Sequence, residues 1–467
     1  MKKILTILLA VVMLLSLMGC GGTEAKEPEE VQGLQAGFGR EKITPSENVY
    51  LQGGDWKNRM STGKLDYQYV TCIALKNGET TVLLYSMDLK VATDNFVDPA
   101  KSAVSKATGV PQENILFNAT HTHSAPAIRY NWDGVEKYRN FFYEAATKAA
   151  ETAIADLAAA EVYAGGVQTE RMTFVRHYVD GLGNIVLRSD PSVAAHYKEA
   201  DQELQLVKLA RGAEDKKDIL LMSFPTHATF NEGGKDMSAD FPGPTRDHIE
   251  ANSDCLVAYF MGSAGDQTPD SMVAGNAYTH DYREYGKKLG QYALDALDSL
   301  SKVEGDGVTL NTRSFTAPTN KKNVDKLVAA QEVKNLIDQY GASSSQVQAA
   351  LEKHGFAMYL EATWTITRAN LEPTMTMELK TLTIGDLGFV LAPYEMFGKH
   401  GAEIKAQSPC ENTFIITNGE GAFNYIASTE AFDFNSYESY CCYFEQGTGE
   451  KLVTEFVDML TQMKQPQ

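Results

Sequence analysis

Six apolar runs in this chain of 467 residues share one feature: each ends in a short cluster of side chains able to do chemistry. Runs of this length, bounded by glycine, proline and asparagine, are typical of buried strands, and helical stretches lie between them. The sequence therefore predicts an α/β fold in which a mixed β-sheet core is flanked by helices. The runs are "TVLLYSMDLK" before Asp88, "NILFNATHTHSAP" with His121 and His123, "DILLMSFPTHATF" with His227, "CLVAYFMGSAGDQTP" with Asp266 and Thr268, "LGFVLAPYEMFG" with Glu395, and "TFIITNGEGAFNYIAST" with Asn418, Asn424 and Tyr425.

The position of these clusters predicts an active site at the strand ends. In open α/β sheets, ligands bind beyond the carboxyl ends of the strands, so the clusters converge if their strands share a sheet. Two histidines, a glutamate and a tyrosine would then offer a divalent ion the nitrogen and oxygen ligands that zinc accepts, with room for a water. A lone His227 would more often be structural, but the joint pattern favours a metal site. An amidohydrolase-type barrel is the remote alternative fold.

The segment "NATHTHSAP", residues 118–126, holds two histidines one residue apart. In an extended segment His121 and His123 point to one face, with Cα atoms about 7 Å apart, whereas on a helix they diverge. Other metal motifs fit poorly. No HExxH occurs, and a metallo-β-lactamase-like HxHxDH needs an acid and a histidine where Ala125 and Pro126 stand.

The first residues, "MKKILTILLAVVMLLSLMGC", join two lysines to an apolar stretch that is too short for a spanning helix, and they predict an export signal over residues 1–19. The run ends in "LSLMGC", which resembles a bacterial lipobox, so Cys20 is expected to carry lipid; an ordinary signal cleaved elsewhere is the alternative. Residues 20–34 are rich in glycine and glutamate and predict an acidic tether, followed by one domain over 35–467. This predicts an exported lipoprotein on the outer side of a bacterial cytoplasmic membrane, at the cell surface or in the periplasm.

The chain is acidic, with 42 basic and 61 acidic residues and a formal net charge of −19. This balance argues against a nucleic-acid partner and against broad attraction to anionic lipid head groups, because both would be repelled. Besides Cys20, five cysteines without CxxC spacing form no disulfide framework and are expected as buried side chains. No internal repeat period is visible, and the sequence does not indicate the oligomeric state.

Taken together and in order, eight segments resemble the neutral or alkaline, non-lysosomal ceramidases and their bacterial relatives. The resemblance extends from about residue 36 to about residue 445, and ordered agreement of this kind is far more specific than one HxH motif. The segments are "AGFGREKITP", "NATHTHSAP", "FVRHYVDGLGN", "DQELQLVKLA", "FPTHATF", "GSAGDQTP", "APYEMFG" and "NYIASTEAF".

The resemblance implies a zinc enzyme that cleaves the amide bond of an N-acyl sphingoid lipid. The implied zinc ligands are His121, His227, Glu395 and Tyr425. His123 would lie near the metal-bound water, where an imidazole can shuttle a proton. The arginine that the family places near the substrate corresponds to Arg176, which we also considered as a brace for the hairpin turn around "DGLGN".

Two departures from the family pattern concern the substrate. The family's GDxSP segment supplies a serine, whereas "GDQTP" places Thr268 there; threonine keeps the hydroxyl, and we expect a catalytic or substrate-positioning role. Asp266 is expected to orient a histidine. The ceramidases also carry an immunoglobulin-like domain after the catalytic one, which this sequence is expected to lack. An N-acyl lipid, a ceramide-like molecule or another amide is therefore the predicted substrate class.

Two other functions compete with hydrolysis. Leader and size alone favour a solute-binding lipoprotein, and a catalytically degenerate relative would bind ligand without turnover. Residues 320–370 read as a helical insertion, either a lid over the pocket or a bundle that supports the sheet. Each of two site residues has a structural alternative: His123 caps a loop instead of carrying a proton, and Tyr425 is a core ring instead of a zinc ligand. Asp88 and Asp240 are expected in turns or caps.

Overall fold

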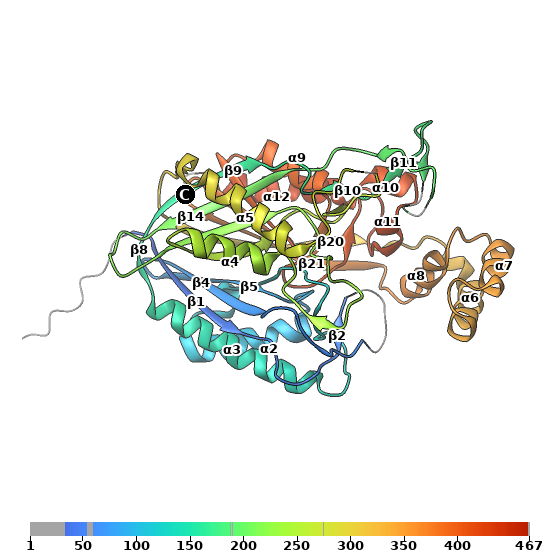
Figure 1. Ribbon diagram of the computed structural model, residues 1–467, viewed down its shortest axis with the longest axis horizontal. Helices are drawn as coiled ribbons and strands as arrows, with labels where there is room; N and C mark the ends of the chain where they lie inside the picture. Colours follow the sequence, from blue (N-terminus) through green and yellow to red (C-terminus); the bar gives the residue numbers. More distant parts are fainter. Residues whose placement is uncertain (1–32, 54–58, 187, 189, 274, 466–467) are drawn as a thin grey trace, which may run out of the picture. The chain divides into compact units, whose positions relative to one another are not determined.

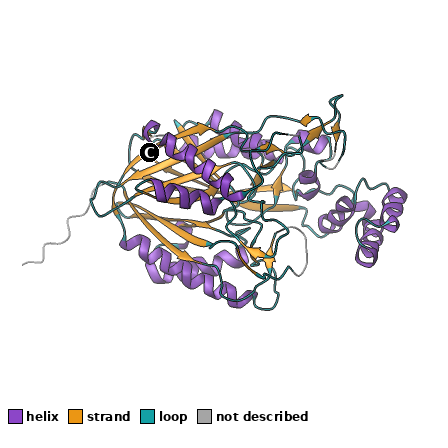
Figure 2. Cartoon of the chain, in the orientation of Figure 1, coloured by secondary structure: helices purple, strands orange, loops and turns teal. Residues whose placement is uncertain are grey.

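The computed structural model describes residues 33–465 except 54–58, 187, 189 and 274. The predicted signal, Cys20 and the tether up to residue 32 lie outside the described residues. The predicted α/β fold, with mixed sheets flanked by helices, is confirmed (Figure 2). No helix in the described part of the chain combines the length and the apolar character needed to cross a membrane.

Among the described residues, three sheets repeat one strand order: three strands run antiparallel in sequence and a fourth lies parallel to the third. The first contains β1 (Gln35–Lys42), β4 (Tyr69–Asn77), β5 (Thr80–Met87) and β6 (Ile115–Ala119). The second contains β9 (Glu161–Gln168), β14 (Glu203–Ala210), β15 (Asp218–Phe224) and β17 (Cys255–Met261). The third contains β20 (Val308–Pro318), β21 (Thr374–Ile384), β22 (Leu387–Leu391) and β24 (Asn412–Ile416).

Helices also follow this repeat. One helix joins the two parallel strands of each sheet, because parallel neighbours need a crossover connection. These helices are α2 (Asp94–Thr108), α4 (Pro242–Asn252) and α9 (Gly398–Gln407). A second helix follows each fourth strand, namely α3 (Val135–Ala155), α5 (Tyr282–Ala296) and α12 (Thr448–Lys464). The described chain thus contains a threefold structural repeat, although its sequence shows no repeat period.

The inner faces of the three sheets pack against one another, and the helix pairs cover the outer faces (Figure 1). Because successive strand residues point to opposite faces, a central strand that is buried on both faces carries apolar residues at successive positions. In β5, Leu84 belongs to the central core and Leu83 to the layer beneath α2 and α3. In β15, Leu221 and Leu220 divide in the same way between the central core and the layer beneath α4 and α5. This double burial accounts for the unbroken apolar runs in the sequence.

Two large insertions that differ between the repeats lie between the first and second strands of a sheet. The second repeat carries four short strands there, β10 (Phe174–Val175), β11 (Tyr178–Val179), β12 (Ile185–Val186) and β13 (Ala195–His196). The third carries α6 (Leu327–Tyr340), α7 (Ser345–His354) and α8 (Tyr359–Ala369), which share a small apolar core of their own. The five described cysteines are buried, and no disulfide joins them.

Candidate metal centre

The carboxyl ends of the three parallel strand pairs meet at one place, because β17 packs against β5, β6 and β24. His121 follows β6, and His227 follows β15. Glu395 begins β23 (Glu395–Met396), and Tyr425 begins β25 (Tyr425–Ile426). These two short strands are parallel, and their register places Glu395 directly opposite Tyr425. Each of the three repeats therefore contributes to one cluster.

The side chains of this cluster lie within hydrogen-bond distance of one another. His227 Nε2 is 3.1 Å from Glu395 Oε2 and 3.4 Å from the Tyr425 hydroxyl. His121 Nε2 is 3.4 Å from the same carboxylate oxygen and 3.1 Å from His123 Nε2. All five side chains are buried. His121, His123 and His227 form a group whose nitrogens are close enough to hold a metal ion together.

Hydrogen bonds on the far side of each ring determine which nitrogen faces the cluster. His121 Nδ1 lies 2.7 Å from the Lys90 carbonyl, and His227 Nδ1 lies 2.9 Å from the Gln267 carbonyl. A carbonyl only accepts, so both Nδ1 atoms donate, and in a neutral ring Nε2 then carries a bare lone pair. Burial, followed by the charge of Arg176, lowers the pKa of His227 and favours this neutral form.

His123 completes the same pattern through Glu232. Its Nδ1 donates to the Glu232 carboxylate at 2.7 Å, which leaves its Nε2 facing that of His121. Burial works against ionisation of Glu232, but the hydrogen bond from His123 and the nearby charge of Lys90 lower the pKa of the glutamate to about 2. Burial, with the nearby Lys90, holds the pKa of His123 well below its ordinary value. The imidazole is therefore neutral and the carboxylate ionised.

The cluster is consequently rich in acceptors. Three Nε2 lone pairs and one carboxylate oxygen converge, and the Tyr425 hydroxyl is the one donor recorded among them. Buried acceptors that face one another repel unless a cation lies between them. Imidazole nitrogen and carboxylate oxygen are ligands that zinc binds.

The backbone around His121 is unusual. His121 has φ 65°, in the left-handed region that non-glycine residues seldom adopt and that clusters at functional sites. The neighbouring chain also approaches closely: a Cβ at Gly53 would lie 2.0 Å from the His123 carbonyl oxygen, and the φ of Gly53 is 148°. Glycine is required there because any side chain would collide with the histidine segment.

Arg176 lies beside the cluster and is held by a buried carboxylate. Its Nε donates to Glu438 Oε1 at 2.7 Å and its Nη2 to the Gly265 carbonyl at 3.0 Å. Its guanidinium lies 5.3 Å from the centre of the Tyr425 ring. The hairpin turn that we considered for Arg176 is braced instead by Asp180, which accepts from the backbone of Leu182 and Asn184.

Glu438 also accepts from His177. His177 Nε2 lies 2.8 Å from Glu438 Oε2, opposite the bond to Arg176. Although burial opposes its charge, Arg176 and His177 hold the pKa of Glu438 far below its ordinary value. Burial opposes the positive charge of His177, whereas Glu438 stabilises it. The net effect raises the pKa of His177.

Thr268 and Asp266 form hydrogen bonds outside the histidine cluster. The Thr268 hydroxyl donates to Asp270 at 2.6 Å, and within the described chain it has no recorded hydrogen bond to the histidines. The Asp266 carboxylate accepts from the backbone N–H of Gly398 at 2.8 Å, while the carbonyl of neighbouring Gln267 orients His227. The segment "GSAGDQTP" thus positions its neighbours chiefly through backbone groups.

Asp88 and Asp240 have structural partners. Asp88 is paired with both terminal nitrogens of Arg246, at 2.8 and 2.6 Å. Asp240 accepts backbone N–H groups of Asn231 and Phe241, at 2.9 and 2.8 Å. Both carboxylates order the loops beneath the histidines.

Comparison with solved structures gives the fold a precedent. A structure described as "Ceramidase complexed with C2" matches with a TM-score of 0.70 and 17% identity, over 93% of this chain and 76% of that one. The neutral ceramidase from Pseudomonas aeruginosa matches with a TM-score of 0.69 and 17% identity, over 93% and 75%. This protein has the neutral ceramidase fold. No protein-family model and no curated protein match the chain.

In this ceramidase fold a cavity of about 580 Å³ adjoins the cluster. Glu395 and Tyr425 form part of its wall, and Trp364 and Thr367 of α8 form another part. The helical insertion therefore contributes directly to the cavity, whichever of the two expected roles it has. The other residues that line the cavity are Leu51, Gln52, Gly53, Lys90, Val91, Arg129, Tyr130, Trp132, Asn424, Tyr437, Cys441 and Tyr443.

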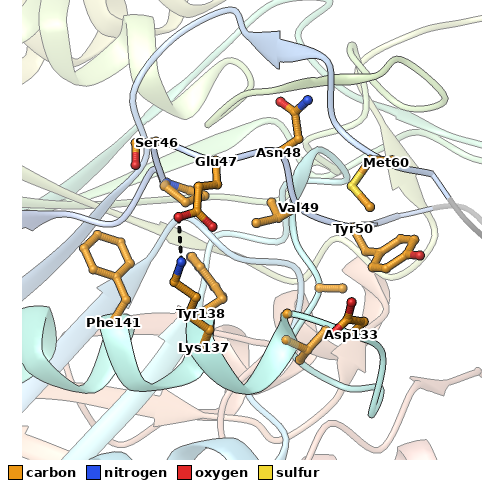
Figure 3. Close-up of a pocket in the computed structure, with 14 residues that line it drawn as sticks. Ser46, Glu47, Asn48, Val49, Tyr50, Met60, Asp133, Lys137, Tyr138 and Phe141 are labelled. Carbon is orange, nitrogen blue, oxygen red and sulfur yellow. Dashed lines mark hydrogen bonds and ion pairs between the residues drawn. The ribbon is translucent and has the colours of Figure 1, made fainter.

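A second cavity, of about 200 Å³, is lined by Tyr50 (Figure 3). The Tyr50 ring meets that of Trp132, which lines the larger cavity, edge to face at 5.2 Å. The wall of the second cavity includes Phe141 and Tyr138 of α3, and an ion pair of 2.5 Å joins Lys137 to Glu47. Its described lining contains neither Glu395 nor Tyr425, which line the larger cavity.

Sequence reasoning missed Glu232 and Glu438. Glu232 lies five residues after His227, within "HATFNEGG", where an acid beside a strand-end histidine was an available signal. Glu438 lies in "NSYESYCC", which contains nothing that distinguishes it from a solvent-facing residue. Its 1% exposed side chain reflects contacts with residues more than 250 positions earlier.

Proposed function

We propose that the protein is a zinc-dependent hydrolase that cleaves amide bonds in N-acyl lipids or ceramide-like molecules. The observation that carries this proposal is the convergence of three imidazole Nε2 atoms and a carboxylate oxygen, with the Tyr425 hydroxyl as the one recorded donor. The ceramidase fold supports amide hydrolysis as the reaction class.

The donor set fits zinc better than the hard cations. Imidazole nitrogens suit zinc, whereas calcium and magnesium prefer oxygen ligands throughout. Zinc bound here would supply a Lewis acid and lower the pKa of a water molecule to roughly 7. The proposed ligands are His121, His227, Glu395 and Tyr425. A set of His121, His123 and His227 is the alternative that the distances also allow.

Each remaining polar group has a proposed part in the reaction. His123 takes a proton at Nε2 and passes it to the leaving amine, because its Nδ1 is already bonded to Glu232. Arg176 places positive charge against the Tyr425 ring and the developing negative charge, and Glu438 holds it there. Burial, with the charge of Glu395, raises the pKa of Tyr425, so its phenol keeps the proton until a cation replaces it.

Metal analysis and substrate profiling on one preparation test the proposal. Protein purified without added metal should contain about one zinc ion per chain. It should also hydrolyse members of a panel of N-acyl amides. A wild-type protein without metal would instead favour a solute-binding lipoprotein. His248→Ala is the matched control, because His248 lies on α4 and bonds Gln291, outside the cluster.

One observation favours a second candidate, a relative that binds ligand without turnover. Thr268 stands where the family has a serine, and its hydroxyl is committed to Asp270. Under that candidate, wild type and Thr268→Ser would both bind zinc and amide ligands without hydrolysing any amide or ester. Activity in wild type excludes it. Activity in Thr268→Ser alone would identify the threonine as the cause.

We further propose export and lipid attachment at Cys20, from the segment "LSLMGC". The lipid would hold the domain at the outer side of the cytoplasmic membrane, close to membrane-borne amide substrates. The acidic residues that follow Cys20 would keep the domain clear of anionic head groups.

A further inference from the structure

Two cations line the cavity beside the acceptor cluster, and neither forms an ion pair with a described carboxylate. Among its described lining residues the charged ones are Lys90, Arg129 and Glu395. The Glu395 carboxylate faces the histidines at 3.1 and 3.4 Å, so it is committed to the proposed metal centre. The lining therefore has a net positive charge even before a metal ion is added.

Lys90 lies immediately beside the centre. Its carbonyl accepts from His121 Nδ1 at 2.7 Å, and its half-buried side chain lines the cavity. No described carboxylate lies within ion-pair distance of its ammonium group. Arg129 lines the same cavity, where its Nη2 approaches the Tyr443 hydroxyl at 3.5 Å, and it too has no described carboxylate within ion-pair distance.

Several lysines elsewhere in the described chain do have carboxylate partners. Lys101 and Lys380 share Glu420 at 2.6 Å each, and Lys405 contacts both Asp201 and Glu203. The chain as a whole is acidic, with a net charge of −19, so carboxylates are abundant. Lys90 is half-buried, whereas Arg129 is exposed to solvent. A partly desolvated cation without an ion pair costs free energy, and such an arrangement is typical of a site whose counter-ion arrives with the ligand.

Aromatic rings line the same cavity. Tyr130 and Trp132 stack with their ring centres 4.3 Å apart. The ring centre of Trp364 in α8 lies 5.8 Å from that of Tyr443. These rings offer apolar surface beside the two cations. A ligand that matches both features is amphipathic and carries negative charge.

We propose that the substrate is an N-acyl amide bearing an acidic group, a carboxylate or sulfonate, as N-acyl amino acids do. Lys90 and Arg129 bind the acidic group, and the rings of Trp132, Trp364 and Tyr443 contact the apolar chain. This inference rests on the proposed function, since it assigns the substrate class of the same site. It departs from ceramide, which has no acidic group.

The test measures kcat/KM of the metal-loaded full chain for matched acidic and neutral amides. N-dodecanoylglycine and N-dodecanoyltaurine are the acidic substrates, and N-dodecanoylethanolamine and N-dodecanoylglycine methyl ester are the neutral ones. We expect kcat/KM for the acids to exceed that for the neutral amides by about tenfold or more. Lys90→Gln and Arg129→Gln should each reduce this acid-to-neutral ratio by about tenfold. Lys137→Gln, a lysine paired with Glu47 in the other cavity, should leave the ratio unchanged.

A binding measurement separates the two proposals. Titration calorimetry with N-dodecanoylglycine and N-dodecanoylethanolamine on metal-free protein reports ligand preference without turnover. Preferential binding of the acid that Arg129→Gln abolishes, with no hydrolysis of any amide, supports the inference and overturns the proposed function. Hydrolysis of acidic and neutral amides at equal rates overturns the inference and leaves the proposed function standing. A ratio that neither substitution changes also overturns the inference.

Discussion

His227 Nε2 lies 3.1 Å from Glu395 Oε2, and both atoms are acceptors when the imidazole is neutral. The opposite nitrogen of the ring already donates to the Gln267 carbonyl at 2.9 Å, so the ring cannot turn to present an N–H without losing that bond. A proton or a metal ion between the two atoms removes the repulsion. This relationship makes the ligand set directly testable.

Removing one proposed ligand should release the metal. We expect His227→Ala and Glu395→Gln to lower bound zinc from about one ion per chain to less than roughly a tenth of that, because a site with three protein ligands holds zinc far more weakly than one with four. Elemental analysis after dialysis measures this. Glu403→Gln, a half-exposed residue of α9 near Lys399, is the matched control.

His123→Ala distinguishes the two ligand sets. If His121, His227, Glu395 and Tyr425 hold the ion, this variant keeps its zinc and loses amide hydrolysis by about a hundredfold or more, as expected for a lost proton carrier. Zinc content and kcat measured on the same sample distinguish the two ligand sets. Loss of zinc together with activity would favour the set of three histidines.

Glu232→Gln should slow turnover without releasing the metal. The carboxylate accepts from His123 Nδ1 at 2.7 Å and stabilises the imidazolium that forms when the ring takes a proton. An amide in its place supports this charge less well, so we expect kcat to fall by about tenfold or more with KM little changed. Steady-state kinetics with zinc analysis tests this. An unchanged kcat would remove Glu232 from the proton path.

Glu438→Gln should destabilise the fold by about 3–5 kcal/mol, because it leaves the buried charge of Arg176 uncompensated. The effect should depend on pH. The pKa of Glu438 is lowered in the fold, so its stabilisation is present above its ordinary value of 4.5 and is lost as the pH falls. The pKa of His177 is raised, so its contribution is complete below its ordinary value of 6.5 and is lost as the pH rises through the folded value.

The difference in stability between wild type and Glu438→Gln should therefore be largest between about pH 4.5 and 6.5. Urea denaturation at several pH values measures it. Glu430→Gln is the control, since its ion pair with Lys198 lies at the surface and contributes about 0–1 kcal/mol. A difference independent of pH across this range would contradict the assignment.

Cys20→Ala tests lipid attachment. We expect the wild-type protein to sediment with membranes and to incorporate labelled fatty acid, and the variant to lose both properties. Cell fractionation and labelling measure this. Fatty-acid labelling that persists in the variant would place the lipid elsewhere.

Much of the candidate site was visible in the sequence because each of its residues follows an apolar run. His121, His227, Glu395 and Tyr425 all lie just beyond buried strands. Local patterns of this kind depend on residues a few positions apart, which one sequence displays directly. The strands belong to three sheets, and their carboxyl ends meet because the sheets pack face to face.

The threefold repeat was not predictable from the sequence. Its elements recur in the same order, but the insertions between the first two strands differ in length and content, so no constant period remains. Glu438 and the cationic cavity were hidden for a related reason. Glu438 acquires its role from Arg176, which lies hundreds of positions away in the sequence. Lys90 and Arg129 come to line one cavity only when the chain folds.

The sequence by itself determined the α/β class, the buried strands and the residues that carry the chemistry, because these follow from local apolar periodicity and from the chemistry of side chains. Only the tertiary structure decided which of those residues meet, which nitrogen of each histidine faces its neighbours, and which charges remain without a partner. Those properties arise when three sheets bury a common face, and burial turns distant side chains into one another's only available partners.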